Sequence, residues 1–402
     1  MLKLLLIVMS LAVLQTAVAK DLRTVTEPKI PAACTSLTGT GKEETSVIQK
    51  ALSSCAKGKA VRLASGTFIS GPLTIPSGVG LWVDSEATLK ASTNPKDYDT
   101  GKNLCGALDD TGLNCNPFII IKDAKGSGIY GKGTIDGQGG HIMTGKNESW
   151  WQLAQDALVK DNHQNCPRLI EIVDSEDITL YQITLKDAPK FHVGSATTNG
   201  FTAWGVTITA PGTARNTDGI DPIDSRNITI AHCHISTGDD NVAIKAIVKP
   251  VSHISILNNV FGTGHGMSIG GGAYSGVTDM TVTSLILDGT TNGLRIKSDK
   301  SRGGLVNGVS YTNVCMRNVQ NPILLDTHYT TDPGNLTPVY KNISFNNITV
   351  LTPGKFTFDG ISEAYPVEVT LNNVHIKKGS TWVVSNAKIK GKYSEDASGT
   401  HC

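Results

Sequence analysis

Aromatic residues are scarce in this chain, and no segment beyond its first nineteen residues is a long hydrophobic run. Only 5% of the 402 residues are Phe, Trp or Tyr, and no run of Arg and Lys is interleaved with them. Single-stranded nucleic acid is bound by aromatic stacking platforms beside a cationic track, so we expect no nucleic-acid partner. A membrane-spanning helix needs about 20 apolar residues, so we also expect no membrane partner.

The chain has no excess of charge of either sign. Without the first 19 residues, 35 basic residues face 35 acidic ones, because Lys3 is the only charged residue in that segment. A protein with no net charge exerts little long-range attraction on a polyanion. Selectivity for a charged ligand must therefore come from a local group of residues.

Residues 1–19 have the pattern of a secretory signal peptide. Lys3 provides the positive start, residues 4–14 the short apolar core, and Ala-Val-Ala at residues 17–19 a cleavage site. The apolar core is too short for a membrane span. We therefore predict that residues 1–19 are removed, that residues 20–402 form a single domain, and that the mature protein is secreted to the extracellular space.

All eight cysteines lie beyond the predicted cleavage site. In an oxidising compartment an even number of cysteines favours disulfides, although eight allow many connectivities. Cys105 and Cys115 bracket a short loop, so we predict that they pair. A second predicted bond, Cys34–Cys55, would tie the start of the chain to its first helix. Zinc binding is the alternative, but the chain lacks paired C-x-x-C motifs, and we expect no metal and no cofactor.

From residue 178 onward the sequence repeats in short β-rich segments. Their starts are 23 to 34 residues apart, and about 27 on average. This period, without intervening helical periodicity, indicates a solenoid and argues against a TIM barrel. We therefore predict an all-β fold, a right-handed single-stranded parallel β-helix. The segments begin at Ile178, Phe201, Ile228, Ile254, Met280, Val309, Ile343 and Val369.

Two columns of the aligned repeats predict the turn and the interior of each coil. The fourth residue after each start is a polar or turn-forming type that suits a tight coil corner. The next column is apolar except for Asn259, so it should face the lumen. Cys233 belongs to this lumen column and Cys315 lies one column further on, and we expect both to be buried thiols. The corner column is Gln182, Gly205, His232, Asn258, Ser284, Asn313, Asn347 and Asn373.

Shorter strand segments between residues 58 and 136, each near a glycine, predict the first coils. Residues 43–55 form an amphipathic pattern, and we expect this short N-terminal helix to cap the open edge of the first coil. A second short helix is predicted at residues 150–160, in an excursion between coils.

Three carboxylates, an imidazole and two cations recur about one coil apart. Successive groups are separated by 21, 25 and 30 residues, and in a coiled β-structure such spacings stack them on one wall, about 4.8 Å per coil. Paired carboxyl groups can hydrolyse a glycosidic bond, and cations can hold an acidic sugar. The strings are Asn216-Thr217-Asp218-Gly219, Gly238-Asp239-Asp240, Gly264-His265-Gly266 and Arg295-Ile296-Lys297.

In this order the strings resemble the signature of polygalacturonases, glycoside hydrolase family 28, and residues 168–299 are most similar to bacterial members. The resemblance implies an inverting hydrolysis of α-1,4-linked galacturonate in homogalacturonan, the de-esterified form of pectin. It implies that Asp239 is the general acid and that Asp218 and Asp240 position and deprotonate the attacking water. His265 would sit beside the acid and tune its protonation.

The resemblance also implies a set of substrate-binding residues. Arg295 and Lys297 are expected to clamp a galacturonate carboxylate, and Asn216 belongs to the same set. Tyr329 resembles the family's substrate-stacking tyrosine. His192 is a further candidate, with a buried, hydrogen-bonded histidine as the alternative. We interpret the two remaining aspartates of this region, Asp221 and Asp224, as loop formers.

An endo-acting, monomeric enzyme is predicted, because no appended domain or long insertion is evident that would close one end of the cleft. Several alternatives remain open. They are an exo-acting polygalacturonase, a rhamnogalacturonan hydrolase, a pectate lyase that uses Ca²⁺, and a non-catalytic pectin-binding β-helix. The last would be marked by loss of one of the three carboxylates, and all three are present.

Overall fold

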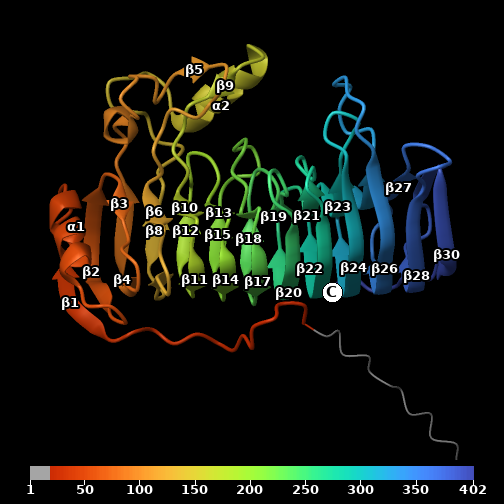
Figure 1. Cartoon of the computed structure of the whole chain (residues 1–402), viewed down its shortest axis with the longest axis horizontal. Helices are drawn as coiled ribbons and strands as arrows, with labels where there is room; N and C mark the ends of the chain where they lie inside the picture. The colour runs from red at the N-terminus through yellow and green to blue at the C-terminus, as the bar shows by residue number, and fades with distance from the viewer. Residues whose placement is uncertain (1–18) are drawn as a thin grey trace, which may run out of the picture.

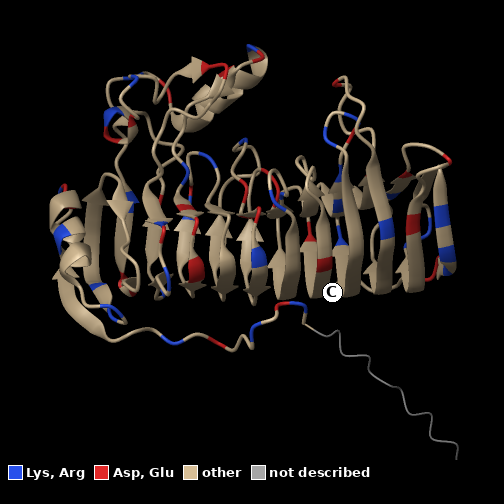
Figure 2. Cartoon of the chain, viewed as in Figure 1, with Lys and Arg blue, Asp and Glu red and all other residues tan. Residues whose placement is uncertain are grey.

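The computed structural model describes residues 19–402, which wind into a parallel β-helix (Figure 1). Two long sheets of 17 and 11 strands carry the fold, and within both the strands pair in parallel with strands of the neighbouring coils. The predicted parallel β-helix is confirmed. Of the predicted signal peptide, residues 1–18 lie outside the described residues. In the view of Figure 2 acidic and basic residues are intermingled along the solenoid.

The strands of the larger sheet are β1 (Ala33–Thr38), β2 (Ala60–Ser70), β4 (Gly80–Ala91), β7 (Gly128–Tyr130), β8 (Thr134–Asp136), β11 (Glu176–Tyr181), β12 (Thr184–Lys186), β14 (Asn199–Trp204), β15 (Thr207–Thr209), β17 (Arg226–Ala231), β18 (His234–Ser236), β20 (Val251–Phe261), β22 (Val277–Asp288), β24 (Gly304–Arg317), β26 (Pro338–Val350), β28 (Val367–Ile376) and β30 (Ala387–Ser394). Those of the smaller sheet are β3 (Leu73–Thr74), β6 (Ile119–Lys122), β10 (Ile170–Val173), β13 (Val193–Ala196), β16 (Ile220–Ile223), β19 (Val242–Ile244), β21 (Met267–Gly270), β23 (Asn292–Lys297), β25 (Asn321–Asp326), β27 (Lys355–Asp359) and β29 (Thr381–Ser385).

Both columns of the repeat have the predicted conformation. All eight corner residues have φ between 52° and 64°, the left-handed region that Gly and Asn tolerate best. All eight residues of the following column are at most 2% exposed, so they fill the lumen. The corner turns the chain, and the next side chain points inward to be buried against the coils on either side.

Asn259 is the one polar residue in the lumen column, and its amide is fully used. Its Oδ1 accepts a hydrogen bond from the backbone N–H of Cys233 at 2.8 Å, and its Nδ2 donates to the carbonyl of Ile230 at 3.0 Å. Both partners lie one coil earlier, so the side chain bridges coils inside the lumen. A buried polar group is tolerated when it is hydrogen-bonded in this way.

The first coil is covered by helix α1 (Thr45–Ser54), which lies at the N-terminal end of the solenoid (Figure 1). Ile48 and Leu52, one turn apart, are fully buried, and a disulfide between Cys34 and Cys55 joins the helix to β1. The predicted capping helix and the predicted Cys34–Cys55 bond are confirmed.

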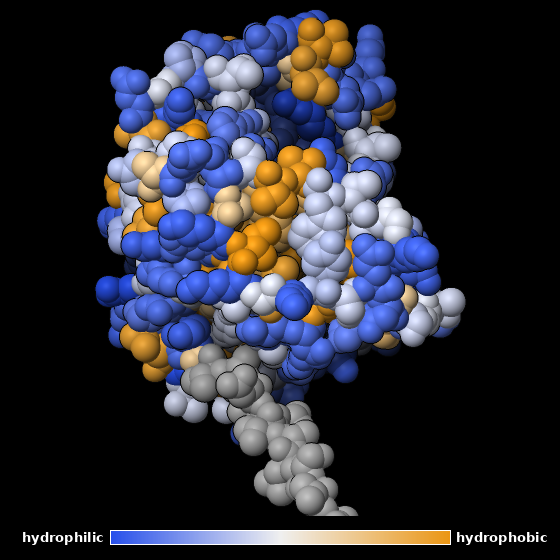
Figure 3. Space-filling model, turned by 90° about the vertical axis from the view of Figure 1, so that its right-hand side faces the viewer, coloured by the Kyte–Doolittle hydropathy of each residue, from blue (hydrophilic) through white to orange (hydrophobic). Residues whose placement is uncertain are grey.

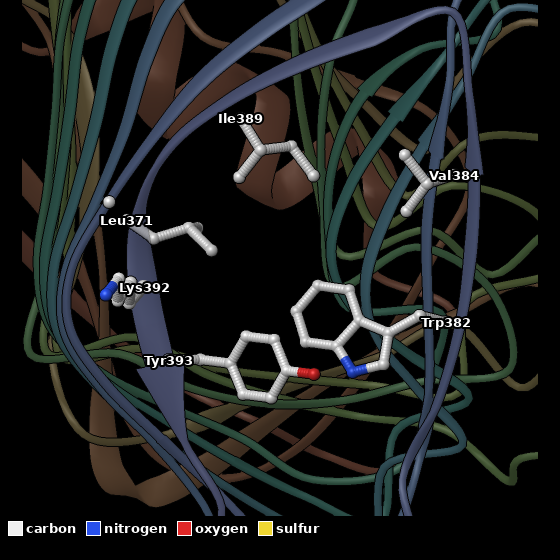
Figure 4. Close-up of a pocket in the computed structure, with 7 residues that line it drawn as sticks. Leu371, Trp382, Val384, Ile389, Lys392 and Tyr393 are labelled. Carbon is white, nitrogen blue, oxygen red and sulfur yellow. The ribbon is translucent and has the colours of Figure 1, made fainter.

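The opposite end of the solenoid has no such cover among the described residues. Figure 3 looks onto this end and shows hydrophobic side chains at its centre. The lumen opens there between Leu371, Trp382, Val384, Ile389 and Tyr393 (Figure 4), and Val384 and Tyr393 remain 53% and 41% exposed. Trp382 stacks on Phe356 of the preceding coil with ring centroids 4.6 Å apart.

The remaining cysteines correct one prediction. Cys105 and Cys115 are bonded as expected, and Cys233 is a buried thiol. Cys315 is not a free thiol, because it forms a disulfide with Cys402. Val314 fills the lumen, so the adjacent Cys315 points outward from β24, where the C-terminal tail returns.

An excursion stands above the solenoid near β6 and β10 (Figure 1). It contains a short 3-10 helix (Pro95–Tyr98), the antiparallel strands β5 (Leu108–Asp109) and β9 (His163–Gln164), and helix α2 (Trp150–Val159). The predicted second helix is thus confirmed. Helix α2 begins at a capping box, in which the Ser149 hydroxyl accepts from the backbone of Gln152. Between residues 19 and 402, no helix is long and apolar enough to cross a membrane.

Replacing the polar residue of the lumen column tests this account of the interior. Asn259→Leu leaves the Cys233 N–H and the Ile230 carbonyl buried without partners, and each unsatisfied group costs about 1–3 kcal/mol. We expect the free energy of unfolding to fall by about 2 kcal/mol or more, measured by calorimetry or denaturant titration. The control is Asn258→Gly at the adjacent corner, which should have little effect because glycine accepts the positive φ. Equal stability of the two variants would contradict the account.

Candidate active site

The smaller sheet places the predicted residues on one wall of the solenoid. Strands β16, β19, β21 and β23 are consecutive neighbours in this sheet. Asp218, Asp240 and His265 each lie two residues before the start of one of the first three strands, and Arg295 and Lys297 lie within the fourth. The strand ladder therefore stacks equivalent positions of successive coils, as the spacing predicted.

Backbone hydrogen bonds continue this ladder through the loops that hold the aspartates. The N–H of Gly219 donates to the carbonyl of Asp240 at 2.9 Å, and the N–H of His265 donates to the carbonyl of Asp239 at 2.9 Å. On the other side, the N–H of His192 donates to the carbonyl of Asp218 at 2.8 Å. The site thus stands on paired backbone rather than on free loops.

Asp239 is hydrogen-bonded to groups from its own coil, the preceding coil and the following coil. Its Oδ1 accepts from its neighbour's backbone N–H, that of Asp240, at 2.8 Å and lies 3.0 Å from Nδ1 of His265. The amide Nδ2 of Asn216 donates to Oδ2 of Asp239 at 3.3 Å, and Asn216 accepts in turn from Gln164 at 2.9 Å. Asp239 retains 19% of its side-chain exposure, so it is both oriented and accessible.

Asp240 is almost completely buried and ion-paired. Lys297 Nζ lies 2.8 Å from its Oδ2, and Arg295 lies 3.8 Å from its Oδ1. The Ser268 hydroxyl donates to the same Oδ1 at 2.7 Å. The ring of Tyr329 lies 5.3 Å from both cations, within range of a cation–π interaction. Two cations, a carboxylate and an aromatic ring thus converge beside Asp239.

Asp218 has an unexpected pair of neighbours. Lys245 Nζ lies 3.2 Å from Asp218 Oδ2 and 2.5 Å from Asp221 Oδ2. Asp221 is fully buried on β16, so its interpretation as a loop former is wrong. Strand alternation turns its side chain outward to the same wall as Asp218, not into a turn. Asp224 does act within a loop, where it accepts from the backbone N–H groups of residues 247 and 248.

His192 does not contact the cleft directly. It is fully buried, its Nδ1 lies 3.1 Å from the carbonyl of Asp218, and its Nε2 accepts from the N–H of Ala188 at 3.4 Å. Burial lowers its pKa to about 4, so the ring is neutral and Nδ1 donates. The prediction of a substrate-binding histidine is corrected to the alternative, a buried histidine that supports the Asp218 backbone.

The carboxylates of the site differ in protonation. Burial, and then the charge of Asp221, raise the pKa of Asp218 well above its usual range, against the opposing effect of Lys245. Burial likewise raises the pKa of Asp221. For Asp239 burial also disfavours ionisation, but the hydrogen bond and charge of His265 outweigh it and lower its pKa to about 2. In the unliganded protein, therefore, Asp239 is the ionised partner of His265, and the Asp218–Asp221 pair tends to keep a proton.

Within residues 19–402, two groups of side chains bring possible metal-ligand atoms within 4.8 Å of one another. In the group formed by Asp239, Asp240 and His265, the ammonium group of Lys297 already lies 2.8 Å from Asp240 and neutralises its charge. A divalent cation there would have to displace this ammonium group. The second group, Asp326, His328 and Asp359, lies two coils beyond, and His328 Nδ1 is 2.8 Å from Asp359.

The excursion forms part of the surroundings of the site, which corrects the expectation that no long insertion approaches the cleft. Besides the Gln164 contact to Asn216, Lys190 donates to the carbonyl of Gly112 at 3.1 Å. Arg215 donates to the carbonyl of Ala154, in α2, at 3.0 Å. Sequence reasoning missed this because the excursion has no periodicity that relates it to a coil.

Carboxylates, an imidazole and cations on consecutive coils of a parallel β-helix define a glycoside hydrolase site. Residues 55–398 match the glycosyl hydrolases family 28, and the chain belongs to this family. An endo-polygalacturonase of Pectobacterium carotovorum subsp. carotovorum is 52% identical over 380 residues, 93% of this chain and 94% of the relative. A polygalacturonase of Ralstonia solanacearum is 39% identical, covering 82% of this chain and 72% of the relative.

A solved structure gives the same result in three dimensions. The polygalacturonase from Erwinia carotovora ssp. carotovora superimposes with a TM-score of 0.90 at 50% identity, covering 92% of this chain and all of the other. The predicted family and fold are thereby confirmed. The roles of individual residues remain predictions.

The His265–Asp239 pair makes a testable prediction about proton affinity. The hydrogen bond that His265 donates to the Asp239 carboxylate raises the pKa of His265 above its usual 6.5. The pair therefore favours the folded state between the ordinary pKa values of Asp, 3.8, and His, 6.5, and this contribution is lost as the pH rises through the folded pKa of His265 or falls through that of Asp239. In an NMR titration His265 should titrate above 6.5, and Asp239→Asn should lower its pKa. A wild-type value at or below 6.5 would refute the pairing, and His265→Gln assigns the resonance.

Proposed function

We propose that this protein is a secreted endo-polygalacturonase that hydrolyses α-1,4-linked galacturonate in de-esterified pectin with inversion. One observation carries the proposal: three carboxylates and the Arg295–Lys297 pair converge on consecutive strands of one wall. This arrangement combines acid–base groups with local cations in a chain of no net charge. The named activity of relatives up to 52% identical supports the same substrate.

Asp239 is the proposed proton donor to the leaving glycosidic oxygen. In the unliganded site its proton resides mainly on His265, 3.0 Å away, so the two residues together hold the proton that one carboxyl group must deliver. Galacturonate carboxylates bound nearby add negative charge, which raises the pKa of Asp239 and shifts the proton toward it. The Asn216 amide, which donates to the other oxygen of Asp239, leaves the carboxyl group oriented during the transfer.

Asp218 and Asp240 are the proposed acceptors for the proton of the attacking water. An inverting enzyme needs a carboxylate that activates water on the face of the sugar opposite the acid. Asp240 is fixed by Lys297 and Ser268. Asp218 has one buried oxygen, Oδ1, with no hydrogen-bond partner within the described chain, so one acceptor position of this carboxyl group is unused.

Arg295, Lys297 and Tyr329 are proposed to bind the galacturonate unit next to the scissile bond. The cations supply hydrogen bonds and charge for the sugar carboxylate, and the 36% exposed ring of Tyr329 supplies an apolar face. Lys297 already pairs with Asp240, so substrate carboxylate and catalytic carboxylate would share one ammonium group. This couples recognition of the acidic sugar to the state of Asp240.

Secretion is supported by the three disulfides, since such bonds persist in oxidising compartments, and by the leader pattern of residues 1–19. For cleavage mode, two relatives that are 52% and 51% identical over 93% of this chain are endo-acting by name. The excursion contacts the site through Gln164, whose side chain donates to Asn216.

Polygalacturonate as substrate tests both the reaction and its mode. We expect reducing ends to appear without an ultraviolet-absorbing unsaturated product, equally with and without EDTA, and highly esterified pectin to react poorly because it lacks the carboxylate charge. Viscosity should fall steeply before many ends are released. An unsaturated product that depends on Ca²⁺ would indicate a lyase, and monomer released from the outset at nearly constant viscosity would indicate an exo-acting enzyme.

The proposed proton donor is tested by Asp239→Asn, which keeps the shape of the side chain and removes the acid. We expect turnover to fall by about a hundredfold or more, the usual contribution of general acid catalysis, with substrate binding largely retained. Binding of oligogalacturonate to the variant, followed by calorimetry, is the control for the fold of the cleft. Retention of more than about a tenth of the wild-type rate would exclude Asp239 as the acid.

A further inference from the structure

We infer that Lys245 and Asp221 are positioning residues that orient Asp218 and set the pH range in which it is ionised. This inference rests on the proposed function, because it assigns Asp218 a role as proton acceptor. Neither residue lies in the strings that carry the six predicted catalytic and carboxylate-binding groups. Both were found only from the structure.

The geometry makes Lys245 a bridge between two coils. It follows β19, and its backbone pairs with Ile223 at the end of β16. From there its side chain reaches back over the preceding coil and places Nζ between Asp218 and Asp221. The ring centroid of Phe191 lies 4.4 Å from the ammonium group, within range of a cation–π interaction. The lysine is therefore fixed by two carboxylates and an aromatic ring.

The two aspartates differ in what they can do. Asp221 has no exposed surface, whereas Asp218 is 4% exposed and next to the catalytic wall. Each has one oxygen bound to Lys245, and each has a buried second oxygen, Oδ1, with no partner in residues 19–402. An unpaired buried carboxylate oxygen is costly. At Asp218 we assign this oxygen to the proton of the attacking water, and at Asp221 it is a position where a proton can reside.

The charges around Asp218 show why the lysine matters. On its own coil it faces Asp221, and on the following coil Asp239 and Asp240, all of which disfavour its ionisation. On the preceding coil are Lys190, which is partly buried, and the neutral His192. Lys245 is the one cation in direct contact with Asp218 within the described chain.

Two substitutions should therefore move the acidic limb of the pH–rate profile in opposite directions. Lys245→Met removes the cation, so Asp218 becomes harder to ionise and the acidic limb of kcat should shift to higher pH by about one unit or more. Asp221→Asn removes a competing negative charge but keeps a hydrogen-bond acceptor for Lys245. Asp218 is then easier to ionise, and the limb should shift to lower pH.

The double variant Lys245→Met/Asp221→Asn is the matched control, because it removes one charge of each sign and preserves the net charge of the cluster. We expect its acidic limb between those of the single variants. In Lys245→Met, kcat at the pH optimum should fall tenfold or more, with KM within about twofold, since Lys245 is not proposed to bind substrate. Lys245→Arg should restore part of the lost kcat.

The outcomes separate this inference from the proposed function. If wild-type protein does not hydrolyse polygalacturonate, the proposed function fails before any variant is compared. If wild type is active and the folded variants, checked by circular dichroism and thermal unfolding, keep an unchanged acidic limb, the inference is wrong. If Lys245→Met does not fold, the double variant and Asp221→Asn still test the inference. The inference is wrong if the acidic limb of kcat lies at the same pH in those two variants and in wild type.

Discussion

The parallel pairing of the smaller sheet is the constraint on which the site depends. Each strand is held in register with the strands of the coils before and after it, so a residue two positions before one strand stacks on the residue two positions before the next. Asp218, Asp240 and His265 occupy this same position on β16, β19 and β21. The protein thus needs no special loop to gather its acidic groups. A shift of one residue in register would turn each inward or outward side chain to the opposite face.

Stacking charges on successive strands also creates the electrostatic problem that the site must solve. Carboxylates about one strand spacing apart repel one another, and burial increases the repulsion. The structure divides them into pairs, each with its own cation: Asp239 with His265, Asp240 with Lys297, and Asp218 and Asp221 with Lys245. Burial raises the pKa of Asp218 and Asp221, whereas at Asp239 the hydrogen bond and charge of His265 outweigh burial and lower the pKa.

The repeated part of the fold was predictable from sequence because a coil imposes a chemical requirement at fixed places. A corner needs a residue that accepts positive φ, and the next residue must fill the lumen, so Asn313 and Val314 could be assigned without coordinates. The Asp239, His265 and Lys297 strings were likewise recognisable by order and spacing. Prediction failed where periodicity carries no information. Cys402 lies in a non-repeating tail, so its bond to Cys315 left no signal in the columns. The excursion that brings Gln164 to Asn216 is outside the repeat.

The roles of Asp221 and Lys245 were not predicted from the sequence for a different reason. Both lie just outside the recognised strings, and an aspartate beside a proline or a lysine at a strand end is common on exposed turns. Only strand alternation, applied to β16 and β19, shows that both side chains project onto the catalytic wall. In a solenoid sequence, assigning each strand residue to the lumen or to the outer surface, also outside a known motif, can therefore reveal further residues of the site.

The open end at Trp382 and Tyr393 determines the end from which the solenoid unfolds. In a solenoid each coil is stabilised mainly by its two neighbours, and the coil of β29 and β30 has only one, with no helix over its lumen. Fraying under heat or denaturant therefore begins at this end and advances toward β24, where the Cys315–Cys402 bond holds the C-terminal tail, while α1 and the Cys34–Cys55 bond secure the other end. The Arg295–Lys297 clamp stands closer to the advancing front than Asp218 does. A partly frayed molecule would thus lose the cations proposed to hold the acidic sugar before it lost the carboxylates proposed to cleave it.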